Sequence, residues 1–406
     1  MNRKRVRKKM GERNLNFDKE IDRRHTNCLK YDFTNRKGMP EKVLPLWVAD
    51  MDFRISSYIQ DALHKQVDHG IYGYSEVQEE YYEALSGYMK RHHNWDVKRH
   101  WLIKTPSVVF ALAMAVQTFT EKGDKVLIQK PVYYPFQEVI EKNDRIVVDN
   151  PLIFDEEDNT YRINFEDFEK KIIQNRIKLF LLCNPQNPTG RVFTKEELIT
   201  MGDICYRHHV IVVSDEIHED FVWDRHTHSP FASLKEEYKE ISITCTSPSK
   251  TFNIAGLQIA NIFIPNTKLR RKYRAHINAA GYNQLNAVGL VGCEAAYRYG
   301  DEWLDGVRAY IKGNIDFTRE YLVKYLPQIE MIEPEGTYLV WLNCRKLGLT
   351  QQELDHLMIH KAGLWLDSGT MFGDNGTGFQ RINVACTRKT LTQALNQLRD
   401  AIDEEE

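Results

Sequence analysis

Apolar positions along the first three quarters of the chain form short runs that alternate with segments of helical periodicity. Residues 124–129, 177–183, 210–213 and 241–246 are short, mainly apolar runs typical of strands that are covered on both faces. Between them, residues 107–119 predict a buried helix, and Thr194 to Glu197 is a capping box that begins another. Strands alternating with helices predict an α/β fold with a mostly parallel sheet flanked by helices.

The pattern changes after about residue 300. A long helical stretch, 302–325, precedes an alternating strand at 336–342 and a further strand at 379–385, and Thr390 is expected to cap a final helix. This region predicts a smaller α+β domain, joined by part of the N-terminal segment. The expected organisation is a disordered basic tail (1–14), an N-terminal segment packing with the small domain (15–60), a large domain (61–299) and a C-terminal small domain (300–406).

Composition excludes several classes of protein. The 406 residues are 42% hydrophobic and 28% charged, which is ordinary for a globular chain, and the formal net charge is −2. This charge argues against nucleic acid or an anionic membrane as the main partner. The basic opening MNRKRVRKKMGER could serve as a nucleic-acid arm, but a solvated, frayed tail is the favoured interpretation.

The cysteines and the lengths of the apolar segments indicate where in the cell the protein is expected to be. The seven cysteines are scattered, odd in number and without a C-x-x-C pair, a pattern typical of reduced thiols in a cytoplasmic protein. No zinc or other metal site is expected from it. No apolar run is long enough to cross a membrane, and the basic opening lacks the apolar core of a secretory signal.

Reactive side chains follow the ends of the four predicted strands. Tyr133 and Tyr134 follow the first, Asn184 and Asn187 the second, and Asp215, Glu216 and His218 the third, while Lys250 follows the fourth. Each has an ordinary structural explanation when taken singly, such as a turn, a helix cap or a solvated charge. Ligands of open α/β sheets bind beyond the carboxyl ends of the strands, so we expect these side chains to share one crevice.

This set of groups matches the needs of pyridoxal phosphate (PLP). PLP requires a lysine for a Schiff base, a carboxylate that keeps its pyridine nitrogen protonated, and usually an aromatic ring over its face. Its phosphate needs backbone amides at a helix start, which residues 106–109 would supply through Val108 and Val109. The hydroxyls of Ser247 and Ser249 are placed to reach the same phosphate.

Several motifs resemble those of a known family. NPQNPTG (184–190), SDEIHED (214–220) and SPSKTFNIAGLQ (247–258) resemble the fold-type I PLP-dependent enzymes of the class I/II aminotransferase superfamily. LWVADMDF (46–53) and GYS (73–75) resemble, more narrowly, its cystathionine β-lyase-like C–S lyases. The resemblance runs from about residue 15 to the C-terminus and implies a large PLP-binding domain plus the smaller domain.

The resemblance assigns a role to each candidate. Lys250 is the Schiff-base lysine, Asp215 partners the pyridine nitrogen, and Tyr133 stacks on the ring. Asn187 bonds the 3-oxygen and contributes to the substrate site, and His218 lies beside it. Tyr74 reaches the phosphate from the second subunit of a homodimer. Arg381 grips the α-carboxylate of a small amino-acid substrate.

Two positions depart from the superfamily pattern. Many aminotransferases carry a phosphate-binding arginine where this chain has Gln258, and a glycine is common in place of Ser107. Glutamine is tolerated among the C–S lyases, so position 258 favours a lyase. The expected function is PLP-dependent β-cleavage of cystathionine or related cysteine S-conjugates. An aminotransferase and a catalytically weak PLP-binding regulator are the alternatives.

Overall fold

A seven-stranded sheet forms the centre of the larger part of the molecule. The computed structural model describes residues 15–404, so the predicted tail, 1–14, lies outside the described residues. The strand order is β2-β10-β9-β8-β7-β3-β4; β10 is antiparallel to both of its neighbours and the other pairs are parallel. The α/β fold with a mostly parallel sheet is therefore confirmed. The strands are β2 (Leu102–Thr105), β3 (Lys125–Ile128), β4 (Ile146–Asp149), β7 (Leu179–Cys183), β8 (Ile211–Asp215), β9 (Ser242–Thr246) and β10 (Ala260–Phe263).

Helices cover both faces of this sheet, which is why its central strands are almost wholly buried. In β7, Leu179 and Leu181 pack into one core with α4, α5 and α9, whereas Phe180 and Leu182 pack into another with α6 and α7. Buried α4 is apolar on nearly every side and begins at a Ser107 cap. The helices are α4 (Val108–Phe119), α5 (Pro135–Glu141), α6 (Phe165–Asn175), α7 (Lys195–Arg207) and α9 (Thr267–Ala279).

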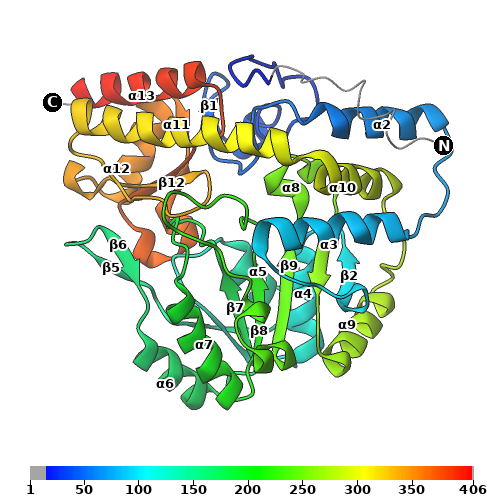
Figure 1. Cartoon of the computed structure of the whole chain (residues 1–406). Helices are drawn as coiled ribbons and strands as arrows, with labels where there is room; N and C mark the ends of the chain where they lie inside the picture. The colour runs from blue at the N-terminus through cyan, green and yellow to red at the C-terminus, as the bar shows by residue number, and fades with distance from the viewer. Residues whose placement is uncertain (1–14, 405–406) are drawn as a thin grey trace.

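A smaller antiparallel sheet lies beside the large one and carries the C-terminal helices (Figure 1). Its order is β11-β12-β15-β14. We predicted an alternating strand at 336–342, but β12 begins later and is buried along its whole length, because side chains pack on both of its faces. The elements are β11 (Glu330–Met331), β12 (Leu339–Asn343), β14 (Asp367–Ser368), β15 (Phe379–Asn383), α11 (Asp301–Tyr325), α12 (Gln351–His356) and α13 (Arg388–Asp403).

The cap of the last helix was misplaced by the sequence pattern. Thr387, not Thr390, is the N-cap residue of α13, and the Thr387 hydroxyl oxygen accepts a hydrogen bond from the Thr390 N–H at 3.2 Å. Both positions are threonines three residues apart, so composition alone could not choose between them. The core face of the helix, including Leu391, Leu395 and Leu398, is buried as predicted.

The N-terminal segment packs against the small sheet before it enters the large domain. Strand β1 (Leu44–Pro45) pairs in parallel with β13 (Leu364–Trp365). Further along, α2 (Ser57–His69) and α3 (Glu79–His93) pack on α10 (Ala287–Tyr299) above the large sheet (Figure 1). The domain boundaries themselves remain predictions.

Two smaller features complete the fold. A hairpin of β5 (Ile153–Asp155) and β6 (Thr160–Arg162) stands apart from both larger sheets. Lys250 lies on the short helix α8 (Pro248–Thr251), directly after β9. Within residues 15–404, none of the helices combines the length and the apolar character needed to span a bilayer.

Candidate active site

A cavity of about 410 Å³ opens at the carboxyl ends of the central strands. The sequence expected residues beyond four strand ends to meet there, and Tyr133, Asn187, Asp215 and Lys250 all line it. Most of the remaining candidates line it too, so distant motifs form one site. These further residues are Val108, Val109, His218, Ser247 and Ser249.

Asp215 is a buried carboxyl at the end of β8. The strand continues two residues further than the predicted 210–213, so Asp215 is its last residue rather than part of the following turn. The carboxylate accepts a hydrogen bond from the Ile217 N–H at 3.1 Å. Burial raises the pKa of Asp215 to about 7, against the opposing effects of that hydrogen bond and of Lys250. A ligand cation beside this carboxyl would favour its ionised form.

Lys250 carries an amine that is unusually easy to deprotonate. Its Nζ donates a hydrogen bond to the Ala49 carbonyl oxygen at 2.5 Å. Burial lowers the pKa of Lys250 to about 8; the charge of Arg381 lowers it further, while Asp50 and Asp215 oppose the shift. A substantial fraction of the amine is therefore neutral near physiological pH, the form that can attack an aldehyde or accept a proton.

Two loops hold the aromatic and amide groups of the site together. The Tyr133 N–H donates to the Asn187 carbonyl oxygen at 2.9 Å. Gly190 ends the NPQNPTG turn at a φ of +73°, and a Cβ there would lie 3.1 Å from the Pro334 Cα, so this turn requires glycine.

His218 carries a neutral imidazole in the cavity. Burial, with the charges of Lys250 and Arg381, lowers the pKa of His218 to about 3.

Backbone and hydroxyl groups gather at one end of the cavity. The first N–H groups of a helix have no partner within it, and in α4 these include Val108 and Val109. The Ser107 hydroxyl oxygen accepts from the Phe110 N–H at 3.1 Å and therefore serves as the helix cap. Ser247 Oγ lies 2.8 Å from Ser249 Oγ. This end offers donors suited to an anion such as a phosphate.

Arg381 is buried in the small sheet. It lies on β15 between β12 and β14, with 2% of its surface exposed, which excludes a solvated arginine on a sheet edge. Its Nη1 donates to Asn187 Oδ1 at 2.7 Å, and its Nη2 donates to the Trp47 carbonyl oxygen at 2.8 Å and pairs with Asp367. Arg381 Nε has no hydrogen-bond partner. The guanidinium joins the candidate site through Asn187 and keeps a free donor for a ligand.

An N-terminal strap, residues 46–53, was not recognised as part of the site. Its carbonyl groups accept from Arg381 at Trp47 and from Lys250 at Ala49. Asn383 Nδ2 donates to two further strap carbonyls, and Asn253 bonds both the N–H and the C=O of Met51. The strap thus connects the strand that carries Arg381 to the helix that carries Lys250. Main-chain roles of this kind leave no residue-type signal in a sequence.

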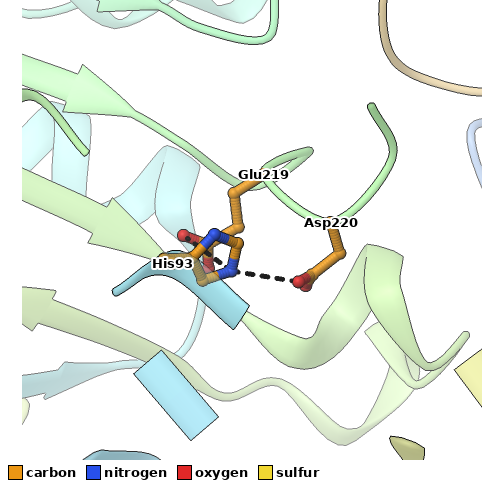
Figure 2. A group of neighbouring side chains, drawn as sticks. All are labelled: His93, Glu219 and Asp220. Atoms are coloured by element: carbon orange, nitrogen blue, oxygen red, sulfur yellow. Dashed lines mark hydrogen bonds and ion pairs between the residues drawn. The ribbon is translucent and has the colours of Figure 1, made fainter. Parts of the chain in front are cut away.

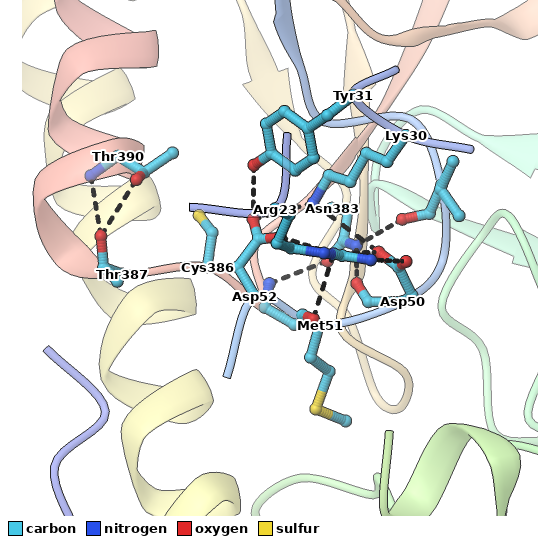
Figure 3. A network of polar contacts seen from close by, with 12 residues as sticks. Arg23, Lys30, Tyr31, Asp50, Met51, Asp52, Asn383, Cys386, Thr387 and Thr390 are labelled. Carbon is cyan, nitrogen blue, oxygen red and sulfur yellow. Dashed lines mark hydrogen bonds and ion pairs between the residues drawn. The ribbon is translucent and has the colours of Figure 1, made fainter. Parts of the chain in front are cut away.

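A cluster of charged residues holds the strap from its other side (Figure 3). Arg23 bridges Asp50 at 2.5 Å and Asp52 at 2.7 Å, and the buried Lys30 pairs with Asp52 at 2.8 Å. The Tyr31 hydroxyl donates to the same carboxylate at 3.2 Å. Several buried or half-buried pairs in one network hold a segment more firmly than isolated surface pairs do.

Tyr74 is a candidate that does not meet the others in its own chain. It lies in the extended segment after α2 with 94% of its surface exposed, and it does not line the cavity. Ile71 and Tyr72 of the same segment are also more than half exposed.

The groups that line the cavity fit PLP. A carboxyl buried against Ile217 suits a protonated ring nitrogen, and a lysine whose pKa is lowered to about 8 has enough neutral amine to react with an aldehyde. His218 Nδ1 is buried without a hydrogen-bond partner, which leaves a polar atom for a ligand to satisfy. The amides at the start of α4 suit the phosphate.

This fold and site define a family to which the chain belongs. It is the family described as aminotransferase class I and II, whose model matches residues 42–398. The cystathionine beta-lyase PatB of Bacillus subtilis is 43% identical over 388 residues, which cover 96% of this chain and all of that protein. The resemblance stated from the motifs is therefore confirmed.

Two solved structures resemble the whole chain. Cystalysin from Treponema denticola, which contains a pyridoxal 5'-phosphate cofactor, aligns with a TM-score of 0.93 at 34% identity, over 97% of this chain and 100% of its own. The PLP-bound C–S lyase from Staphylococcus hominis aligns with a TM-score of 0.89 at 34% identity, over 96% and 98% of the two chains.

Proposed function

We propose that this chain is a PLP-dependent C–S β-lyase that cleaves cystathionine or related cysteine S-conjugates. The observation that carries the proposal is one cavity that brings together the Lys250 amine, the buried Asp215 carboxyl and, through Asn187, Arg381. Relatives that match the chain over nearly its whole length are named cystathionine β-lyase and C–S lyase. PLP is the cofactor, and the protein is an enzyme.

Each candidate residue has a place in holding the cofactor and substrate. When bound, PLP supplies an electron sink that stabilises negative charge at the substrate Cα. Asp215 would face its ring nitrogen and Tyr133 its ring, with Asn187 and His218 at the 3-oxygen. Arg381, through its unpartnered Nε and with the Asn187 amide beside it, would bind the α-carboxylate. The Val108 and Val109 N–H groups and the Ser249 hydroxyl would donate to the phosphate. The Ser247 hydroxyl donates to the Ile259 carbonyl oxygen at 2.7 Å and would have to turn to reach the phosphate.

Lys250 is proposed to move the proton that starts the reaction. Its neutral amine, held near the strap by Ala49, takes the Cα proton of the substrate. The Cβ–S bond then breaks, and the sulfur leaves with its electron pair and takes up a proton to become a thiol. The remaining three-carbon fragment is released as aminoacrylate, which water converts to pyruvate and ammonia. Lysis and hydrolysis need no external oxidant or reductant.

The first experiment separates the lyase from an aminotransferase. Purified enzyme is incubated with cystathionine and no keto acid, and pyruvate is assayed over many turnovers. A lyase produces stoichiometric pyruvate, ammonia and thiol, because its chemistry regenerates the cofactor by itself. An aminotransferase would stop after about one turnover per site until a keto acid is added. Gln258, which replaces the arginine common in aminotransferases, favours the first outcome.

We also propose that the enzyme works as a homodimer with shared active sites. The support is Tyr74, which the motif resemblance assigns to the phosphate of a partner subunit and which lies exposed, outside the cavity of its own chain. The neighbouring exposed Ile71 and Tyr72 supply apolar surface that a subunit contact would cover. A cytoplasmic location is proposed as well, supported by seven free cysteines.

Mixing two inactive variants tests the shared site. Lys250→Ala and Tyr74→Phe subunits are expected to recover about a quarter of wild-type activity after exchange, because random pairing makes half of the dimers hybrid and each hybrid has one intact site. Pyruvate formation is measured before and after mixing. Each variant exchanged with itself is the control. Proven exchange without recovery would mean that one chain builds its own site.

A further inference from the structure

A second polar cluster lies near the candidate active site, on residues that the proposed chemistry does not use. The motif SDEIHED divides: Asp215 and His218 line the PLP cavity, whereas Glu219 and Asp220 line a separate cavity of about 370 Å³. At the end of α3, His93 meets these two carboxylates (Figure 2). Positions 93 and 220 are 127 residues apart, so no motif spacing could have predicted the cluster.

The ligand atoms of these three residues already lie close together. His93 Nε2 is 3.0 Å from Asp220 Oδ1 and 3.7 Å from Glu219 Oε2. All three atoms lie within 4.8 Å of one another. Zinc bonds of about 2.0–2.2 Å to nitrogen and oxygen place tetrahedral ligands roughly 3.4 Å apart. Small side-chain adjustments would bring the three atoms to that spacing.

Glu219 is the observation that points to a ligand. Its side chain is about 98% buried, yet Oε2 has no hydrogen-bond partner, and in Figure 2 it is turned toward His93. Burial and the neighbouring carboxylates of Asp220 and Glu216 raise the pKa of Glu219 well above its ordinary value. A buried acceptor without a donor is costly, and a bound cation removes that cost.

The surroundings supply too little positive charge for the cluster. The ion-pair partners found for the buried Glu216, Glu219 and Asp220 are the imidazoles of His93 and His228. The two basic side chains that line the same cavity have other partners: Arg308 donates to the Val222 carbonyl oxygen at 3.0 Å, and Lys312 pairs with Asp316 at 2.6 Å and with Asp224 at 3.6 Å.

We propose that His93, Glu219 and Asp220 form a binding site for a divalent transition-metal ion, with Zn²⁺ as the best-fitting probe. One imidazole and two carboxylates are ligands that zinc accepts, whereas Mg²⁺ and Ca²⁺ prefer oxygen alone. The adjoining cavity provides an entry path and room for water as a further ligand. This site departs from the sequence expectation of no metal, and it is independent of the proposed lyase activity.

Such a metal would act on the position of catalytic elements rather than on the reaction. Asp220 Oδ2 accepts from Thr251 Oγ1 at 2.5 Å, and Thr251 follows Lys250 on α8. The turn that supplies Glu219 and Asp220 also carries His218 at the PLP cavity. The bound ion would join the end of α3 to this turn, and the hydrogen bond from Thr251 to Asp220 would connect α8 to the same site, so we expect the ion to raise thermal stability.

Zinc titration of the PLP-loaded enzyme tests the site. The protein is treated with EDTA, exchanged into metal-free buffer and titrated with ZnCl₂ by calorimetry, and bound zinc is counted by mass spectrometry. Wild type should bind one zinc per chain and gain melting temperature. Glu219→Gln and His93→Gln should each lower the affinity for zinc by at least about tenfold. Loss of a residue that only hydrogen-bonds a metal ligand already costs about 10–100-fold in metal affinity, and loss of the ligand itself should cost no less.

A neighbouring histidine provides the matched control. His92 lines the same cavity but contacts Asp301 at 3.0 Å, so His92→Gln should keep wild-type zinc affinity. The proposal is overturned if wild type binds no zinc, or if Glu219→Gln binds zinc as wild type does. It is equally overturned if Glu219→Gln melts at or above the wild-type temperature and zinc stabilises neither protein, because Glu219 is then a protonated structural carboxyl.

Discussion

Lys250→Ala is expected to lower kcat/KM for cystathionine by at least about a thousandfold, because a positioned base alone contributes about 10²–10⁴. The variant loses both the nucleophilic amine and the group that takes the Cα proton. Its fold should survive, since removing a buried amine whose pKa is lowered by burial also removes a cost of folding. Pyruvate release measures the rate, and circular dichroism checks the fold.

The cofactor provides an independent readout for this lysine. Wild-type protein should be yellow, and borohydride reduction followed by peptide mass analysis should find the cofactor on Lys250. The exposed Lys122, which pairs with Asp144 at 2.7 Å, serves as the matched control, and Lys122→Ala should change neither colour nor rate. A borohydride-fixed cofactor on another lysine, in the wild type or in Lys250→Ala, would refute the assignment.

Arg381→Ala should lower kcat/KM by about a hundredfold or more, equivalent to about 2.7 kcal/mol or more of transition-state binding. In our proposal the guanidinium binds the α-carboxylate in a buried setting, where loss of one partner costs several kcal/mol. Arg381→Lys should recover only part of the rate, because an ammonium cannot reproduce the planar group that bonds Asn187 and the Trp47 carbonyl oxygen while keeping Nε for the carboxylate. Steady-state kinetics on cystathionine measure both, and the PLP absorbance should remain.

Asp367 is the buried ion-pair partner of Arg381, so the effect of losing this pair has to be separated from the effect of losing substrate binding. Burial raises the pKa of Asp367, and the charge of Arg381 opposes this shift. In Arg381→Ala the Asp367 carboxyl is therefore easier to protonate, so the variant does not have to bury an unpaired charge and should still fold. Asp367→Asn removes the internal pair but keeps the arginine, and it should retain most activity. An equal loss in both variants would show that the pair, and not substrate binding, explains the effect. Full activity in Arg381→Ala would mean that another cation, such as Arg54, binds the α-carboxylate of the substrate.

Local patterns predicted four strands of the large sheet, β3, β7, β8 and β9, because these lie at its centre and are almost wholly buried, whereas β2, β4 and β10 were not predicted. The run 177–183 contains β7, and the capping box at Thr194 begins α7 as expected. The sequence predicted the small domain less accurately. Strand β12 is fully buried, although the alternating pattern predicted one exposed face, and the N-cap residue of α13 is Thr387 instead of Thr390. Packing against distant segments decides such details, and a local window does not contain it.

The same distinction applies to the site. Side chains with an identifiable chemistry, such as Lys250 and Asp215, follow strand ends, and sheet geometry brings those ends together. The partner of Lys250 was missed because it is a main-chain atom, the Ala49 carbonyl oxygen. The pairing of Arg381 with Asp367 and the meeting of His93 with Glu219 were missed because the folded chain, and not a local pattern, brings these residues together. The motif resemblance singled out Arg381, and its role stays a prediction, whereas its position between β12 and β14 depends on the pairing of strands that a local window does not contain.

The strap also imposes an order on how the enzyme matures during synthesis. Trp47 receives its hydrogen bond from a residue 334 positions later, and Val48 receives one from a residue 335 positions later. A ribosome releases the N-terminal partners of these bonds long before the strand that completes them. Nascent chains can therefore fold the large sheet around Lys250 while the substrate end is still open. Contacts of such high sequence separation form late, so the hydrogen bonds that join the strap to the strand carrying Arg381 are completed only after β15 has emerged.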